Sequence, residues 1–144
     1  MRYFVDVNIL IGLLDSQHSS HRVAVEWFLD HGRHGWASCP TTQNGVIRIM
    51  SQPAYGPTRL DPHETGSRLR SIMGSTDHQL IVDNLSLVDS ELVDLSRVRG
   101  GGAVTDTYLL ALAVAHGGRL ATLDRHIPVN AVPGGPAALE LIPA

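Results

Sequence analysis

Three aspartates stand beside apolar segments at places where a parallel sheet gathers ligands. Asp6 follows the apolar residues 3–5, Asp124 follows residues 120–123, and Asp106 stands at the start of a helical pattern. Ligands bind at the carboxyl ends of the strands in open parallel sheets, so the three side chains are expected to converge. Carboxylates held together repel one another unless a cation lies between them. The pattern therefore predicts a divalent-metal site formed by Asp6, Asp106 and Asp124.

Three further polar side chains belong to this predicted site. Asn8 is placed to orient Asp6 or to bind a metal-bound water, and Thr105 is placed to cap the helix that carries Asp106. Gln43 lies one turn into a helix that follows a strand, on the rim where the aspartates should meet. It occupies the place where a fourth carboxylate would be expected.

Each aspartate has a structural alternative when it is taken singly. Asp6 can cap the helix that follows it, and Asp106 lies in a first helical turn, where the helix dipole favours an acid. Glycines 100–102 precede Asp106, and glycine serves the close approach of a backbone or substrate better than it serves stability. Three acids at equivalent positions of one sheet are hard to attribute to chance.

The elements that must position these residues alternate between strands and helices. Strands are expected at residues 2–5, 36–39, 78–82, 120–123 and 139–142. Helices are expected at residues 7–14, about 20–31, 40–51, 62–74, 89–95 and 106–116. Strands that alternate with helices imply a parallel α/β sheet with right-handed crossovers. The chain shows no linker or repeat, so residues 1–144 are expected to form a single domain.

Composition excludes several classes of protein. With 43% hydrophobic and 17% charged residues the chain is globular rather than disordered. Its apolar runs are too short for a membrane span and its first residues do not resemble a signal peptide, so we expect a cytoplasmic protein. Cys39 is the only cysteine, which excludes an internal disulfide and a cysteine-rich zinc site.

The charged residues give a mixed indication about nucleic acid. The net charge is −3, so no global basic field attracts a polyanion. All eleven basic residues are arginine, which binds phosphate through two parallel hydrogen bonds. A GC-rich genome, which favours arginine codons, explains the same bias equally well.

Four segments taken together resemble a PIN domain. They are residues 5–10 (VDVNIL), 39–45 (CPTTQNG), 104–113 (VTDTYLLALA) and 116–125 (HGGRLATLDR). They are most similar to the VapC toxins of bacterial type II toxin–antitoxin modules, in the style found in mycobacteria. The resemblance covers essentially the whole chain in order and spacing.

The resemblance implies a fold, an activity and partners. The fold would be a three-layer α/β/α arrangement around a parallel sheet of about five strands. The activity would be that of an endoribonuclease that uses one or two Mg²⁺ or Mn²⁺ ions to cut structured RNA, commonly tRNA or rRNA. A VapB-type antitoxin would neutralise it, and such toxins are usually homodimers. An antitoxin helix could lie on the apolar face of residues 23–29 with the helix at 61–74, a face that a dimer interface or the core would explain at least as well.

Site residues carry over by position. Asp6, Asp106 and Asp124 match three acids of the family's quartet, and Asn8 and Thr105 match its supporting polar positions. Gln43 departs from the pattern, because it falls where the family usually has a glutamate. Glutamine keeps the shape and one oxygen but removes a charge, which weakens metal binding without abolishing it.

Two functions follow from this site. The first is metal-dependent hydrolysis of an RNA phosphodiester, in which nearby arginines reverse the local sign of the acidic pocket; the candidates by sequence neighbourhood are Arg119 and Arg125, with Arg97 and Arg99. The alternative is a catalytically weakened or inactive module that binds RNA or antitoxin, because Gln43 replaces the usual glutamate. An aspartyl-phosphatase is disfavoured, because the second Asp of that motif is absent and the chain contains no lysine.

Overall fold

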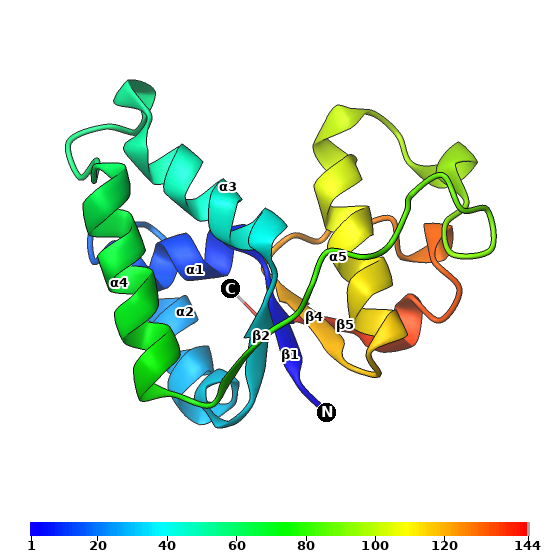
Figure 1. The fold of residues 1–144 in the computed structure, drawn as a ribbon, viewed down its shortest axis with the longest axis horizontal. Helices are drawn as coiled ribbons and strands as arrows, with labels where there is room; N and C mark the ends of the chain where they lie inside the picture. Colours follow the sequence, from blue (N-terminus) through cyan, green and yellow to red (C-terminus); the bar gives the residue numbers. More distant parts are fainter. Residues whose placement is uncertain (144) are drawn as a thin grey trace.

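Five parallel strands form the centre of the protein. The computed structural model describes residues 1–143, and its sheet has the order β3-β2-β1-β4-β5, with every neighbouring pair parallel. The strands are β1 (Tyr3–Val5), β2 (Trp36–Ser38), β3 (His78–Leu80), β4 (Arg119–Thr122) and β5 (Leu139–Leu141). β1 and β4 are central neighbours, so the segments that follow them, with Asp6 and Asp124, leave the sheet side by side (Figure 1).

Helices cover both faces of the sheet. α1 (Val7–Leu14), α2 (His21–Asp30), α3 (Pro40–Ser51) and α4 (Pro62–Ser75) gather on one side, and α5 (Val104–Ala115) lies on the other (Figure 1). Short 3-10 helices complete the α5 side, among them η3 (Leu95–Arg97), η4 (Gly101–Ala103), η5 (Val129–Ala131) and η6 (Pro136–Ala138). The expected three-layer α/β/α arrangement is therefore confirmed.

The side chains of the central strands alternate between two hydrophobic clusters. Phe4 and Leu120 join the cluster that contains the buried face of α5, whereas Val5 and Ala121 join the cluster formed with α1 to α4. Successive residues of a strand point to opposite faces, so a strand buried on both faces is apolar throughout. This explains why the central strands are short uninterrupted apolar runs.

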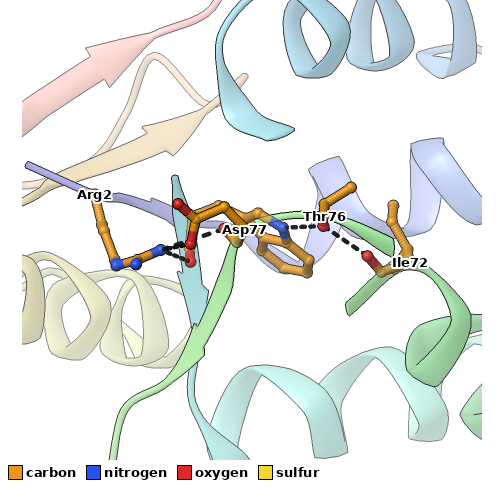
Figure 2. A network of polar contacts seen from close by, with 5 residues as sticks. Arg2, Ile72, Thr76 and Asp77 are labelled. Carbon is orange, nitrogen blue, oxygen red and sulfur yellow. Dashed lines mark hydrogen bonds and ion pairs between the residues drawn. The ribbon is translucent and has the colours of Figure 1, made fainter. Parts of the chain in front are cut away.

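The amino end of the sheet is held by a polar network. Arg2 Nη1 donates to Asp77 Oδ1 at 2.8 Å, and Trp36 Nε1 donates to Thr76 Oγ1 at 2.8 Å (Figure 2). Thr76 Oγ1 in turn donates to the backbone oxygen of Ile72 at 2.6 Å. These contacts join the starts of β1, β2 and β3 to the end of α4, at the edge of the sheet opposite to the three aspartates.

Most element boundaries agree with the sequence-based predictions, with two corrections. α5 begins at Val104, so Thr105 lies inside the helix rather than capping it, and the cap position is Ala103. The helix expected at residues 89–95 is wrong, because this segment forms turns. Asp89 Oδ1 accepts from the backbone N–H of Glu91 at 3.0 Å, and such local side-chain bonds compete with a helix. None of the described helices is long and apolar enough to cross a membrane.

Candidate active site

The three aspartates line one cavity of about 690 Å³ at the carboxyl ends of β1 and β4. The expected convergence of these side chains agrees with the structure, and Asn8 and Thr105 line the same cavity. The remaining lining residues come from α1, α3 and the loop before α5: Val7, Thr41, Asn44, Gly45, Arg48, Ile49 and Gly102. Gly102 brings the backbone of the glycine-rich loop to the cavity, as expected from its lack of a side chain.

Asp6 both caps a helix and lines the cavity. Its Oδ1 accepts from the backbone N–H of Val7 at 2.7 Å, which satisfies a free amide at the start of α1. Its Oδ2 accepts from the Thr122 hydroxyl at 2.8 Å, and the side chain is only 4% exposed. Burial raises the pKa of Asp6, the hydrogen bonds from Thr122 and Val7 oppose that rise, and the charge of Asp124 adds to it.

Thr122 links two of the three aspartates. Its hydroxyl donates to Asp6 and accepts from the backbone N–H of Asp124 at 3.0 Å. Asp124 Oδ1 accepts from the backbone N–H of His126 at 2.8 Å, which holds the turn after β4. Sequence analysis did not single out Thr122, because a threonine at the end of a strand is also a normal strand former. Its position two residues before Asp124 was the available signal.

Asp106 is the least constrained of the three carboxylates. It lies in the first turn of α5 and accepts no hydrogen bond from any residue within 1–143. Burial, followed by the charges of Asp6 and then Asp124, raises the pKa of Asp106 from 3.8 to about 6. The three carboxylates line a common cavity, so their charges repel one another across it and add to the effect of burial.

The chemistry of these oxygen donors fits Mg²⁺ or Mn²⁺, although the carboxylates do not form a ready-made cage. Among residues 1–143, no group of three or more His, Cys, Asp or Glu side chains is arranged to hold a metal ion. Mg²⁺ keeps several waters and is commonly bound through one or two carboxylates, so it does not need such a cage. The half-buried Asp106, which has no hydrogen-bond partner within the described chain, has the carboxylate oxygens that such an ion prefers.

Gln43 does not lie where the sequence predicted. Its side chain turns away from the cavity, and its Nε2 donates to Ser38 Oγ at 3.0 Å and approaches the Met73 sulfur at 3.8 Å. Asn44 lines the cavity instead. Successive residues of a helix are separated by about 100°, so a shift of one position exchanges a cavity-facing residue for one that packs against the sheet and α4.

The two predicted substrate-binding arginines also lie outside the cavity. Arg119 begins β4, at the opposite edge of the sheet, where its Nη1 pairs with Glu140 Oε1 at 3.3 Å. A strand advances about 3.3 Å per residue, so the start and end of β4 lie about 10 Å apart. Arg125 adjoins Asp124 in sequence, but its exposed side chain does not line the cavity.

Arg48 is the arginine that reaches the cavity, and sequence analysis missed it. It is exposed on α3, with no hydrogen bond or ion pair recorded to its side chain within residues 1–143. Thr41, Asn44 and Arg48 are spaced three and four residues apart, which places them on one helical face. This polar stripe was the signal that could have identified the cavity side of α3.

Asp83 fixes the start of α3 close to α5. Its Oδ2 accepts from the backbone N–H and the hydroxyl of Thr41, both at 2.8 Å, and its Oδ1 accepts from the Tyr108 hydroxyl at 3.0 Å. These hydrogen bonds outweigh the desolvation of Asp83 and lower its pKa. The loop after β3 thus ties together the two helices that form opposite walls of the cavity.

Several proteins that are named as ribonucleases are similar in sequence to this chain over most of its length. Ribonuclease VapC44 of Mycobacterium tuberculosis is 42% identical over 134 residues, which cover 93% of this chain and 94% of that protein. Ribonucleases VapC38 and VapC39 of the same organism are 34% and 32% identical over 83% and 93% of this chain, and over 83% and 96% of their own lengths. No protein-family model matches the chain.

A solved structure shares the fold. A chain in the crystal structure of VapBC2 from Rickettsia felis, bound to a DNA fragment from their promoter, superposes with a TM-score of 0.62. The match covers 98% of both chains at 14% sequence identity, which supports the PIN-like fold and nothing finer. The sequence identity to the mycobacterial proteins is what shows the family. On that evidence, and with three aspartates converging at the carboxyl end of a parallel sheet, this chain belongs to the VapC ribonuclease family.

Proposed function

We propose that the protein is a Mg²⁺- or Mn²⁺-dependent endoribonuclease toxin that cleaves structured RNA and is neutralised by a VapB-type antitoxin. The observation that carries this proposal is the convergence of Asp6, Asp106 and Asp124 on one cavity in a chain whose relatives are named ribonucleases. The antitoxin partner is supported by the complex in which the structural neighbour was solved. A homodimer remains a proposal from the family resemblance.

The residues of the cavity would have different roles in such a reaction. Asp6, Asp106 and Asp124 would hold the divalent ion, with the amide oxygens of Asn8 and Asn44 as neutral neighbours. A bound ion of this kind lowers the pKa of a coordinated water and offsets negative charge on the phosphate. The Thr122 hydroxyl holds the carboxylate of Asp6, and the backbone N–H of His126 holds that of Asp124, so two of the carboxylates are oriented before substrate arrives.

Arg48 supplies the positive charge that the cavity otherwise lacks. Arg48 lines the cavity from α3, and Asp106 lines the same cavity from α5. A guanidinium donates two parallel hydrogen bonds to a phosphate, so Arg48 can bind the nonbridging oxygens of the scissile group. An RNA phosphate would then lie between Arg48 and the divalent ion that the carboxylates would hold, and these two positive charges would offset its negative charge.

The test compares cleavage of total bacterial RNA by the purified protein, by Asp106→Asn and by Asp6→Asn, with Mg²⁺ or Mn²⁺ and with EDTA. We expect metal-dependent cleavage by the unmodified protein and a loss of about 100-fold or more in each variant. Glu91→Gln, the same kind of charge removal at an exposed turn residue, is the matched control. Full activity in both aspartate variants, or in EDTA, would contradict the proposal.

The alternative function, a weakened module that binds RNA or antitoxin, keeps some support. Gln43 does not support it, because that side chain does not face the cavity. Asn44 supports it, because the cavity-facing position of α3 is also uncharged. The absence of a three-ligand metal group within residues 1–143 supports it as well. Calorimetric titration with Mn²⁺ separates the two functions: no binding, together with no cleavage, favours the binding module.

A further inference from the structure

We propose that a second cavity, next to the acidic one, is a phosphate-binding subsite for the RNA strand that passes through the active site. This proposal rests on the proposed ribonuclease function. The cavity has a volume of about 310 Å³ and is lined by two arginines and one wall segment: Arg97, Arg99, Ile127, Pro128, Val129, Asn130 and Ala131. Its size is near the lower end of the range for ligand sites.

The two segments that line this cavity are joined by packing and by a hydrogen bond between their backbones. The 3-10 helices η3 and η5 contact each other, and the backbone N–H of Asp94 donates to the oxygen of Ala131 at 2.7 Å. Ile127 and Ala131 are buried beneath the cavity, which fixes the wall segment to the core. η3, which carries Arg97, is therefore held against a wall segment that is fixed to the core, and Arg99 follows it two residues later.

Both arginines have donor groups available for an anion. Arg97 donates from Nε to Asp94 Oδ2 at 3.2 Å, which orients the guanidinium, and no other contact of its terminal nitrogens is recorded within residues 1–143. No hydrogen bond or ion pair is recorded for the Arg99 side chain within the same residues. A guanidinium held by one carboxylate still has two terminal NH₂ groups, which can bind a phosphate.

The second cavity lies close to the first along two chain segments. Arg99 is three residues from Gly102, and Ile127 is three residues from Asp124. Gly102 and Asp124 both line the acidic cavity. Three residues span at most about 11 Å, so both segments connect the two cavities over that distance or less.

Electrostatics gives the reason for such a subsite. Three carboxylates in the acidic cavity and a net charge of −3 repel a polyanion. An RNA strand that is bound only at the scissile phosphate would gain little binding free energy from the rest of the protein surface. Arg99, whose backbone lies about 11 Å or less from Gly102 at the cavity edge, and Arg97, two residues before it, offset that repulsion for a flanking phosphate. Asn130 adds an amide for a ribose or base, and Pro128 adds an apolar contact.

The experiment measures RNA binding in the Asp106→Asn background, where the strand is expected to stay uncut. A fluorescein-labelled single-stranded RNA of about twelve nucleotides is titrated by anisotropy in Mg²⁺ buffer at several salt concentrations. We expect the Arg97→Ala/Arg99→Ala pair to weaken binding about tenfold or more at low salt and to reduce the salt slope by about 1.4, which corresponds to two phosphate contacts. The control pair, Arg33→Ala/Arg70→Ala, removes the same charge from exposed positions outside both cavities.

The outcomes distinguish this proposal from the function on which it rests. Equal affinities and slopes for the two pairs would overturn the subsite, even if the unmodified protein cleaves RNA. An equal loss of binding to a polyglutamate chain of matched charge would also overturn it, because the arginines would then bind any polyanion. Failure of the unmodified protein to cleave RNA would contradict the nuclease alone. A selective loss of RNA binding would still support the subsite.

Discussion

Removing the charge of Asp106 should stabilise the protein in the absence of metal. Its pKa lies at about 6 instead of 3.8, because burial and the charges of Asp6 and Asp124 disfavour the ionised form. A carboxylate with a raised folded-state pKa binds more protons in the folded than in the unfolded chain between those two values. The free energy of unfolding therefore falls as the pH rises through that window, and above it the full cost of the charge is present.

The magnitude follows from the size of the shift. The rise from 3.8 to about 6, at 1.36 kcal/mol per pH unit, corresponds to about 3 kcal/mol. The Asp106 side chain is only half-buried, so solvent screening reduces this figure, and the dipole of α5 favours the charge by about 0.5 kcal/mol. We expect Asp106→Asn to raise the free energy of unfolding by about 1 kcal/mol at pH 8 and to leave it unchanged near pH 4.

Urea unfolding in EDTA at pH 4 and pH 8 measures this difference, with Glu91→Gln as the control at an exposed site. Mn²⁺ should reverse the order at pH 8, because a ligand that binds only the folded state stabilises it, and the stabilisation grows with the logarithm of its affinity. The asparagine variant should gain less from the metal than the unmodified protein. An Asp106→Asn variant that is less stable than the unmodified protein at pH 8 in EDTA would refute the reasoning, since the three carboxylates would then not repel one another.

Three further predictions test the link between two of the aspartates, the cavity side of α3 and the C-terminal end of α1. Thr122→Val removes the hydroxyl that donates to Asp6, so urea unfolding should show a loss of about 1–3 kcal/mol, and a smaller loss than that would contradict the link. Gln43→Glu should leave Mn²⁺ affinity unchanged by calorimetry, whereas Asn44→Asp should tighten it, because only position 44 faces the cavity; the reverse result would restore the sequence-based assignment. Asp15 accepts three hydrogen bonds that lower its pKa, so its stabilising effect is present above pH 3.8 and is lost as the pH falls below that value. Asp15→Asn should therefore lower the melting temperature at pH 7 and have less effect at pH 3, and equal effects at both values would contradict this.

Several features of the fold could be predicted from local spacing. α1 occupies the predicted residues 7–14, and α3 begins at the predicted Pro40, because proline suits the first turn of a helix. Asp61 caps α4 through its Oδ1, which accepts from the backbone N–H of Glu64 at 2.8 Å. Each of these signals depends on neighbours within one helical turn, so the sequence contains them completely. The prediction of a helix at residues 89–95 was wrong because the polar side chains of this segment can form the hydrogen bonds of a helix start or those of a turn equally well.

The sequence by itself determined the alternation of strands and helices. It also determined that two aspartates follow strands and that a third lies at the start of a helix. A carboxylate directly after a buried strand must lie at one edge of a parallel sheet, whatever the rest of the chain does. Only the tertiary structure decided the rest of the site. The rotation of α3 against the sheet places Asn44 and Arg48, and not Gln43, in the cavity. Arg119 is the first residue of β4, so the length of this strand separates it from the edge of the sheet where the aspartates lie. Both outcomes depend on how whole elements pack, and a helix rotated by one residue changes every side chain it presents.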